Sequence, residues 1–125
     1  MSPRNFRYAI TRAKAAFLVA VRDGRVAGYG LVAFHAGTRI SRIFSFAVDP
    51  GCRRSGIART LLAALEAEAA ARGCRSVRLE VRDDNQAAIA LYSGSGYVRF
   101  GIYPGYYEDD RTALRLEKLL PTPAP

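Results

Sequence analysis

The residues best suited to chemistry lie in an arginine-rich turn between an apolar run and an amphipathic segment. The apolar run stops at Asp49-Pro50-Gly51, and the turn that follows consists of Arg53, Arg54, Ser55, Gly56, Ile57, Ala58 and Arg59. The first N–H groups of a helix lack internal partners, and the helix dipole favours negative charge there. Gly56 would let an anion approach the backbone, and the arginines would add positive charge. The turn is compatible with a phosphate site but, taken alone, fits an ordinary helix start with solvated arginines better.

Two familiar phosphate-binding loops do not occur in this sequence. It contains no G-x-x-x-x-G-K-S/T, and no G-x-G-x-x-G follows an expected strand. Neither a P-loop nucleotidase nor a Rossmann dinucleotide site is therefore indicated. A phosphorylated ligand bound at this turn would belong to another class.

Three polar or aromatic residues after the turn could bind a ligand or handle protons. Glu80 lies on the polar face of an alternating segment, Asn85 precedes a helical pattern, and Tyr92 follows Ile89 at helical spacing. Each also has an ordinary role: a surface glutamate beside arginines, a helix cap and a core aromatic residue, respectively. These residues become informative only together with the elements that position them.

Those elements follow from the period of the apolar residues. A hairpin is expected from Phe17–Val21 and Val26–Phe34 around Asp23-Gly24, and a third strand over Ile40–Val48. Apolar residues at helical spacing predict a helix from Ser55 to Arg72, closed by Gly73. Further expected elements are a strand through Val77–Val81, a helix from Asp84 or Asn85 to Ser93, strands at Tyr97–Tyr103 and Thr112–Leu119, and a short helix before Phe17.

Length and composition limit the possible classes of protein. The 125 residues, half of them hydrophobic, suit one domain over residues 1–120, followed by a proline-rich tail at 121–125. No apolar run approaches the roughly 20 residues of a membrane span, and no secretory signal is visible at the start, so a cytoplasmic protein is expected. Two isolated cysteines, Cys52 and Cys74, indicate neither a metal site nor a disulfide framework.

The chain is strongly basic, with a formal net charge of +8. Such a charge favours polyanionic ligands through long-range attraction, but it does not distinguish nucleic acid, an acidic protein surface and a phosphorylated cofactor. The arginines are spread over almost every segment rather than gathered in one block. The charge therefore belongs to the folded domain and not to a disordered tail.

Four ordered motifs together resemble the GNAT superfamily of N-acetyltransferases, and most of all its bacterial ribosomal-protein alanine N-acetyltransferases. The resemblance spans about Val19 to Leu119 and is most specific from Phe44 to Tyr97. The motifs are Val48-Asp49-Pro50, the turn at 53–58, Leu79-Glu80-Val81-Arg82, and Asn85 with Ala88–Tyr92 and Gly96-Tyr97. The resemblance implies an α/β (α+β) fold: a mixed, mostly antiparallel, splayed sheet with helices on both faces, here with a shortened N-terminal helical region.

The resemblance also implies acetyl-CoA as cosubstrate. Its pantetheine would pair with the strand at Phe46, Ala47 and Val48, and its pyrophosphate would lie on the turn around Arg54 to Arg59. Asn85 matches a residue that contacts the cofactor. No metal is expected, because the two cysteines are too few and too isolated for a metal cage.

For catalysis, the resemblance assigns Glu80 as general base, acting through water, and Tyr92 as general acid near the CoA sulfur. A backbone N–H near Val48 would donate to the oxyanion. Tyr106 and Tyr107 resemble the loop that closes over the acceptor, a protein or peptide α-amine. Glu108-Asp109 follow these tyrosines at once, unlike the spacing in the ribosomal-protein enzymes, so the acceptor pocket is expected to differ in shape.

Other functions remain open at this point. A small-molecule amine could be the acceptor in the same chemistry. A non-catalytic module could bind acetyl-CoA, or could bind RNA or the ribosome through its positive charge, although the sequence carries no aromatic RNP-type strand, zinc spacing or clear helix-turn-helix.

Overall fold

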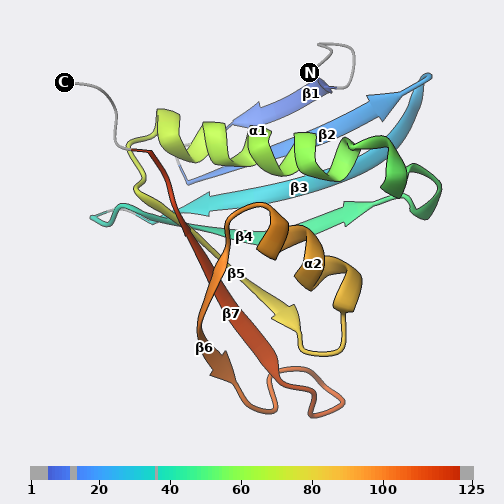
Figure 1. The fold of residues 1–125 in the computed structure, drawn as a ribbon. Coiled ribbons are helices and arrows are strands. Elements are labelled where there is room, and N and C mark those ends of the chain that lie inside the picture. Colours follow the sequence, from blue (N-terminus) through green and yellow to red (C-terminus); the bar gives the residue numbers. More distant parts are fainter. Residues whose placement is uncertain (1–5, 12–13, 36, 122–125) are drawn as a thin grey trace.

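One mixed sheet of seven strands organises the residues that the computed structural model describes, which are 6–11, 14–35 and 37–121 (Figure 1). The strand order is β1-β2-β3-β4-β5-β7-β6, and every neighbouring pair is antiparallel except β4 and β5. The strands are β1 (Phe6–Thr11), β2 (Ala15–Arg22), β3 (Arg25–Phe34), β4 (Ile40–Val48), β5 (Ser76–Arg82), β6 (Val98–Tyr103) and β7 (Ala113–Leu119). The helical elements of the described residues are a 3₁₀ helix, η2 (Pro50–Ser55), and the α-helices α1 (Ile57–Ala71) and α2 (Gln86–Gly94). The expected fold class is confirmed.

The first hairpin forms as its sequence predicts. β2 and β3 pair antiparallel, and the turn residues Asp23 and Gly24 both have positive φ, 52° and 76°. That conformation matches the right-handed twist of the flanking strands, which is why Asp-Gly is a strong hairpin signal. β4 covers the predicted range, Ile40–Val48.

The segment before Phe17 is not the helix that was expected. Residues 6–11 form β1, which pairs antiparallel with β2, and β2 begins at Ala15. A short isolated helix is marginal because nucleation is costly, whereas a strand beside β2 satisfies its backbone groups at once. The prediction of an N-terminal helix is therefore wrong for these residues.

Helix α1 begins two residues later than predicted. Gly56 adopts a left-handed conformation, with φ 81°, and separates η2 from α1, so Ser55 belongs to the 3₁₀ helix. Gly73, with φ 80°, follows the end of α1 as expected. The predicted apolar stripe is buried: Ile57, Leu61, Leu62, Leu65 and Ala69.

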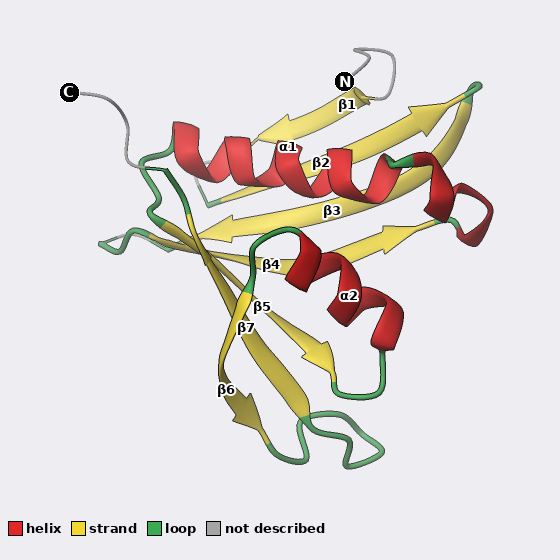
Figure 2. Cartoon of the chain, in the orientation of Figure 1, coloured by secondary structure: helices red, strands yellow, loops and turns green. Residues whose placement is uncertain are grey.

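Both α-helices lie on the same face of the sheet, which differs from the expected placement on both faces (Figure 2). Gly30 and Phe46 are paired across β3 and β4. A Cβ added to Gly30 would lie 2.5 Å from Leu65 of α1, and the Phe46 ring contacts Tyr92 of α2 edge-on. Right-handed crossovers explain this placement, because β4 to β5 and β5 to β6 advance in the same direction between parallel strands.

The sheet splays between β4 and β5, as the resemblance implied. Their parallel pairing covers only Ile40–Arg42 against Ser76–Arg78. Beyond Arg42 the two strands diverge, and a gap opens between the rest of β4 and the rest of β5 (Figure 1). β5 itself has the predicted dry face, with Val77, Leu79 and Val81 buried.

Residues 122–125 of the expected proline-rich tail lie outside the described residues. None of the helices described in this chain is long and apolar enough to cross a membrane.

Candidate active site

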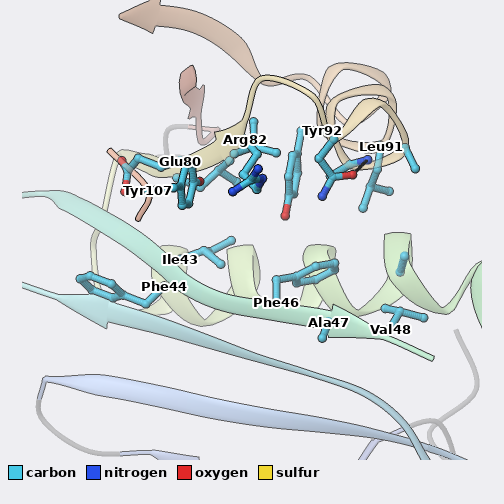
Figure 3. A pocket seen from close by; sticks show the side chains of 16 residues that line it. Ile43, Phe44, Phe46, Ala47, Val48, Glu80, Arg82, Leu91, Tyr92 and Tyr107 are labelled. Atoms are coloured by element: carbon cyan, nitrogen blue, oxygen red, sulfur yellow. Dashed lines mark hydrogen bonds between the residues drawn. The ribbon is translucent and has the colours of Figure 1, made fainter. Parts of the chain in front are cut away.

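A pocket of about 580 Å³ lies where β4 and β5 diverge (Figure 3). Strand β4 forms one wall, and β5 with α2 forms the other. The N-terminal turn of α1 and the loop after β6 each contribute one residue, Ala58 and Tyr107. Five segments that are far apart in sequence therefore meet around one cavity.

On the β4 wall, Phe46, Ala47 and Val48 line the pocket. The pairing of β4 with β5 has ended before these residues, so this edge of β4 has no strand partner among the described residues. A strand edge of this kind presents N–H and C=O groups that can pair with an extended ligand. This part of the site fits a linear amide-containing chain.

The turn at the start of α1 is open to an anion at its backbone. The first hydrogen bond of α1 runs from the Thr60 N–H to the Gly56 carbonyl at 3.1 Å, so the amides of residues 57–59 precede the first intrahelical bond. A Cβ added to Gly56 would meet nothing within 4 Å. The backbone of this turn is therefore approachable, as a phosphate requires.

The side chains of the turn differ in what they can contribute. Ile57 is only 4% exposed and belongs to the core, so only its backbone could face a ligand, whereas Ala58 lines the pocket. Arg59 is exposed, and its guanidinium lies 3.3 Å from the place that a Gly94 Cβ would take. The side chains of Arg53, Arg54 and Ser55 lie outside what the structure describes.

Asn85 caps α2 and also borders the pocket. Its side-chain oxygen accepts a hydrogen bond from the Ala88 N–H at 3.1 Å, while the residue lines the cavity opposite β4. The two readings of Asn85 from sequence, cap and cofactor contact, are thus compatible in one position.

Glu80 projects from β5 into the site and forms an ion pair with Arg42 of β4. Its side chain is only 7% exposed. The neighbours suggested by sequence are not its partners: Arg78 pairs with Glu117 at 2.6 Å, and Arg82 pairs with carboxylates of two loops. The short β4–β5 pairing thus brings a basic strand residue to the candidate base.

Sequence reasoning missed Arg42. The available signal was the alternation in the predicted strand, where Ser41 and Ile43 are buried and Arg42 lies between them. That pattern places Arg42 on the other face but cannot show which carboxylate it meets. Its guanidinium also donates to the Tyr106 hydroxyl at 3.3 Å.

Tyr92 reaches the pocket from α2, and its hydroxyl points toward β4 (Figure 3). The residue is 7% exposed and packs edge-on against the rings of Phe46 and Tyr97. Burial, with a smaller effect of Tyr107, raises the pKa of Tyr92 to about 12. The phenol therefore stays protonated at neutral pH and can serve as a proton donor.

Tyr106 and Tyr107 lie in the loop between β6 and β7, at the mouth of the site. Tyr107 lines the pocket, and burial raises its pKa above the usual range. Tyr106 does not line the cavity but contacts Tyr107 ring to ring at 5.1 Å and accepts the hydrogen bond from Arg42. The two tyrosines thus lie on the Glu80 side of the site.

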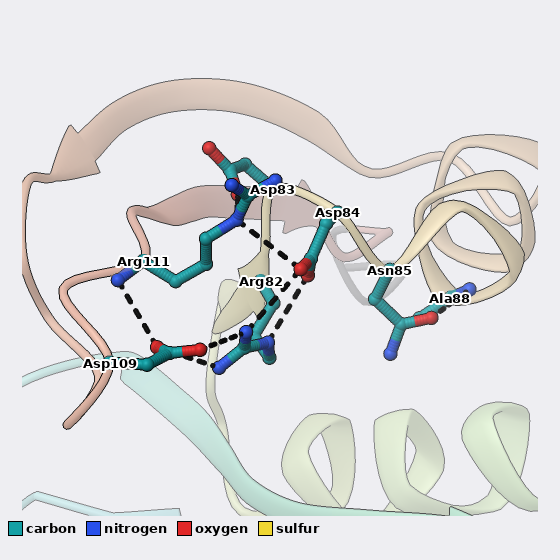
Figure 4. A network of polar contacts seen from close by, with 7 residues as sticks. All are labelled: Arg82, Asp83, Asp84, Asn85, Ala88, Asp109 and Arg111. Carbon is teal, nitrogen blue, oxygen red and sulfur yellow. Dashed lines mark hydrogen bonds and ion pairs between the residues drawn. The ribbon is translucent and has the colours of Figure 1, made fainter.

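A network of charges fastens this loop to the end of β5 (Figure 4). Arg82 donates to Asp109 at 2.7 Å and to Asp84 at 3.1 Å, and it lies over the Tyr107 ring at 5.0 Å. Arg111 adds an ion pair with Asp83 at 3.0 Å. Because each ion pair is exposed, it contributes little to the free energy of unfolding. Together these contacts hold the loop, and with it Tyr107, at the edge of the pocket.

Within the part of the chain that the structure describes, no group of three histidine, cysteine or acidic residues could hold a metal ion.

Comparison with known proteins agrees with this arrangement. The model of the acetyltransferase (GNAT) family matches residues 2–97. The ribosomal protein bS18-alanine N-acetyltransferase of Escherichia coli strain K12 is 45% identical over 65 residues, which cover 52% of this chain and 44% of that enzyme. An uncharacterized N-acetyltransferase of Methanocaldococcus jannaschii is 39% identical over 106 residues, covering 84% of this chain and 67% of the relative.

The fold is shared with solved structures as well. The ribosomal-protein-S18-alanine N-acetyltransferase from Escherichia coli superimposes with a TM-score of 0.79 at 28% identity, covering 91% of this chain and 74% of that one. The chain spans less than half the length of the first curated relatives that it matches. The family match nevertheless includes β1 to β5 and both α-helices, with Glu80, Asn85 and Tyr92. The chain belongs to the acetyltransferase (GNAT) family.

Proposed function

We propose that this protein transfers the acetyl group of acetyl-CoA to a primary amine, the α-amine of a protein or peptide. The observation that carries the proposal is the meeting of Glu80 and Tyr92 in one pocket, on the wall opposite the unpaired edge of β4. A carboxylate and a protonated phenol beside an exposed strand edge supply the base, the acid and the docking surface that acyl transfer from a thioester needs.

Acetyl-CoA would be held by groups that are already in place. The free edge at Phe46–Val48 suits the two amides of pantetheine, and the amides at residues 57–59, which precede the first intrahelical bond of α1, suit the pyrophosphate. Arg53, Arg54 and Ser55 join this set on the strength of the sequence motif, and Asn85 and Ala58 through their place in the pocket wall. Arg59 is exposed beside the turn and would add positive charge.

In the proposed reaction, the amine nitrogen forms a bond to the thioester carbonyl carbon, and the carbon–sulfur bond breaks. The proton lost by the amine goes to Glu80 through water, and the departing thiolate takes the proton of the Tyr92 hydroxyl. The backbone N–H of Val48 would donate to the carbonyl oxygen as its negative charge grows. The products are an amide and free CoA. Glu80 then releases its proton to solvent, and Tyr92 takes up a proton from solvent, so both side chains return to their starting states.

A protein or peptide acceptor is favoured by two observations. A relative that is 45% identical over 52% of the chain is a ribosomal protein bS18-alanine N-acetyltransferase. In this chain, Arg42, which pairs with Glu80, contacts the exposed Tyr106 and Phe44, so the acceptor side borders the surface and could seat an extended chain. A small-molecule amine remains the second candidate within the same chemistry.

Release of free thiol from acetyl-CoA, measured across a panel of peptides and small amines, tests the proposal. Glu80→Gln and Tyr92→Phe should each lower kcat by about 100-fold or more, because acid–base groups typically contribute 10² to 10⁴. Both variants should keep the rise in melting temperature that acetyl-CoA gives the wild type, because a ligand that binds only the native state stabilises it.

Matched controls separate catalysis from general damage. Glu68→Gln changes a glutamate of α1 outside the pocket, and Tyr29→Phe changes an exposed tyrosine of β3; both should keep the wild-type rate. If acetyl-CoA failed to raise the wild-type melting temperature, the cofactor assignment would be wrong. If Glu80→Gln and Tyr92→Phe turned over normally, the roles of these residues would be wrong.

A further inference from the structure

The face of the sheet that carries Glu80 also carries a group of arginines and aromatic rings. Glu80 and Arg115 are partners across β5 and β7, so their side chains lie on one face of the sheet. This face is opposite the one covered by the helices, because the alternating residues Leu79 and Val81 are buried beneath them. An acceptor that reaches Glu80 along the surface would meet this group.

Four of these residues form a chain of contacts around Glu80, which we call the collar: Arg42, Tyr106, Tyr103 and Arg115. Arg42 binds Glu80 and donates to the Tyr106 hydroxyl. The Tyr106 ring stacks on Tyr103 at 5.4 Å, and the Arg115 guanidinium lies over the Tyr103 ring at 4.2 Å. The collar thus leads from the candidate base to Arg115.

The arginines on this face differ in whether a carboxylate neutralises them. Arg42 is paired with Glu80, and Arg78 is paired with Glu117. Arg115 has no carboxylate within ion-pair distance among the described residues, and its Nε is buried without a hydrogen-bond partner there. The positive charge of Arg115 is therefore not neutralised by a carboxylate of the described residues and can attract a ligand anion.

The side chain of Arg115 is also held in place. It lies over the Phe100 ring at 4.6 Å and over Tyr103 at 4.2 Å. Stacking on two rings orients a planar guanidinium and reduces the entropy lost when it binds a carboxylate. This arrangement is typical of a recognition group rather than of a solvated surface arginine.

We propose that Arg115 selects acceptors that carry a carboxylate close to the reacting amine, most simply an acidic side chain at the second or third residue of a peptide. The proposal rests on the proposed acetyltransferase function and names the class of its acceptor. Cross-strand partners have Cα atoms about 4.5 to 5.5 Å apart, and consecutive peptide Cα atoms lie about 3.8 Å apart. An amine at Glu80 therefore brings the next one or two residues over Arg115.

The test compares kcat/KM for peptides that differ only by glutamate or glutamine at the second or the third position. Wild type should favour the glutamate peptide at one of these positions by roughly tenfold, since a hydrogen bond between a guanidinium and a carboxylate is stronger than one to a neutral amide. Arg115→Gln should bring this ratio close to one. Arg115→Lys keeps the positive charge but lacks the planar guanidinium that can bind a carboxylate through two nitrogens, so it should retain part of the preference.

Arg99→Gln is the matched control. It removes the same charge from the neighbouring strand β6, where Arg99 is exposed and paired with Leu116, whose side chain is buried on the helix face. The preference should survive this change, and acetyl-CoA should still raise the melting temperature of every variant. A preference lost equally in Arg99→Gln would assign the effect to net charge and overturn the role of Arg115.

Other outcomes also decide the question. Turnover of peptides without any preference for glutamate would refute this inference and leave the acetyltransferase function standing. A free amino acid acetylated better than every peptide would place the recognised carboxylate on the α-carbon of a small acceptor and refute the peptide assignment. No thiol release with any amine would refute the proposed function, and this inference with it.

Discussion

Tyr92 is the residue whose surroundings give the most direct pH prediction. Burial raises its pKa from about 10 to about 12, so the folded protein keeps the phenol proton where a free tyrosine would lose it. If this proton goes to the thiolate, kcat should stay level between about pH 8 and 10.5 rather than halve near pH 10. Thiol release at saturating substrates, followed over this range, checks the expectation.

A spectroscopic titration provides the control for Tyr92. Tyr92→Phe should remove a late step of the phenolate absorbance, because burial raises the pKa of Tyr92 to about 12. The unfolded chain releases this proton first, so the free energy of unfolding falls as pH rises from about 10 to 12, and rates must be read below that range. A decline of kcat centred near pH 10 would contradict the assignment of Tyr92 as the acid.

Individual residues were predictable from sequence only where a motif or a local role identified them. Asn85 was expected as a cap and is one. Arg42 was not identified, because its contact with Glu80 spans 38 positions and depends on the short β4–β5 pairing. Arg115 depends on register in the same way, through the β5–β7 pairing. Contacts between strands are set by register, which a single sequence does not reveal.

At the scale of elements, the close approach of β4 to β3 predicts that the glycine at position 28 is indispensable. A Cβ on Gly28 would lie 2.8 Å from the backbone oxygen of Ala47, so β4 would have to shift, and 3.4 Å from Leu61. Gly28→Ala should therefore lower the free energy of unfolding by about 1 to 3 kcal/mol. Urea unfolding measures the loss, and acetyl-CoA binding should weaken because β4 must shift.

Gly101→Ala is the strand control for this substitution. Its added Cβ would meet only Arg115 side-chain atoms at 3.6 Å or more, which is an ordinary contact. The expected change in unfolding free energy is below about 0.5 kcal/mol. Equal losses in the two variants would show that flexibility, and not the approach of β4 to β3, explains the glycine at position 28.

The elements themselves were largely readable from the sequence, for reasons that also explain the exception. β4 and β5 were found because β-branched and alternating residues mark them, and α1 because its apolar stripe must face a sheet. β1 was missed although Phe6, Tyr8 and Ile10 alternate along it, because this six-residue strand signal was passed over in favour of a short helix. The placement of both helices on one face followed from crossover handedness, which the sequence pattern alone did not supply.

At the scale of the whole molecule, the net charge of +8 predicts that the rate of acetyl-CoA association depends on salt. Acetyl-CoA carries a pyrophosphate and a further phosphate, so the field of the protein should speed its encounter with the site. Salt screens this attraction, with a Debye length of about 10 Å at 0.1 M and about 3 Å at 1 M. The association rate constant, measured by stopped flow, should fall several-fold between about 50 mM and 500 mM NaCl, while kcat should stay nearly constant.

Acetyl-pantetheine separates this long-range attraction from the local contacts of the pocket. It offers the same amides to the free edge of β4 at Phe46–Val48 but has no phosphate for the turn at Gly56. Its association should therefore be much slower at low salt and nearly independent of ionic strength. Because the arginines are spread over the molecule, removing one distant charge, as in Arg99→Gln, should change the salt dependence only slightly. Equal salt sensitivity of the two thioesters would mean that the basic charge serves another partner, such as the acceptor, and not the cosubstrate.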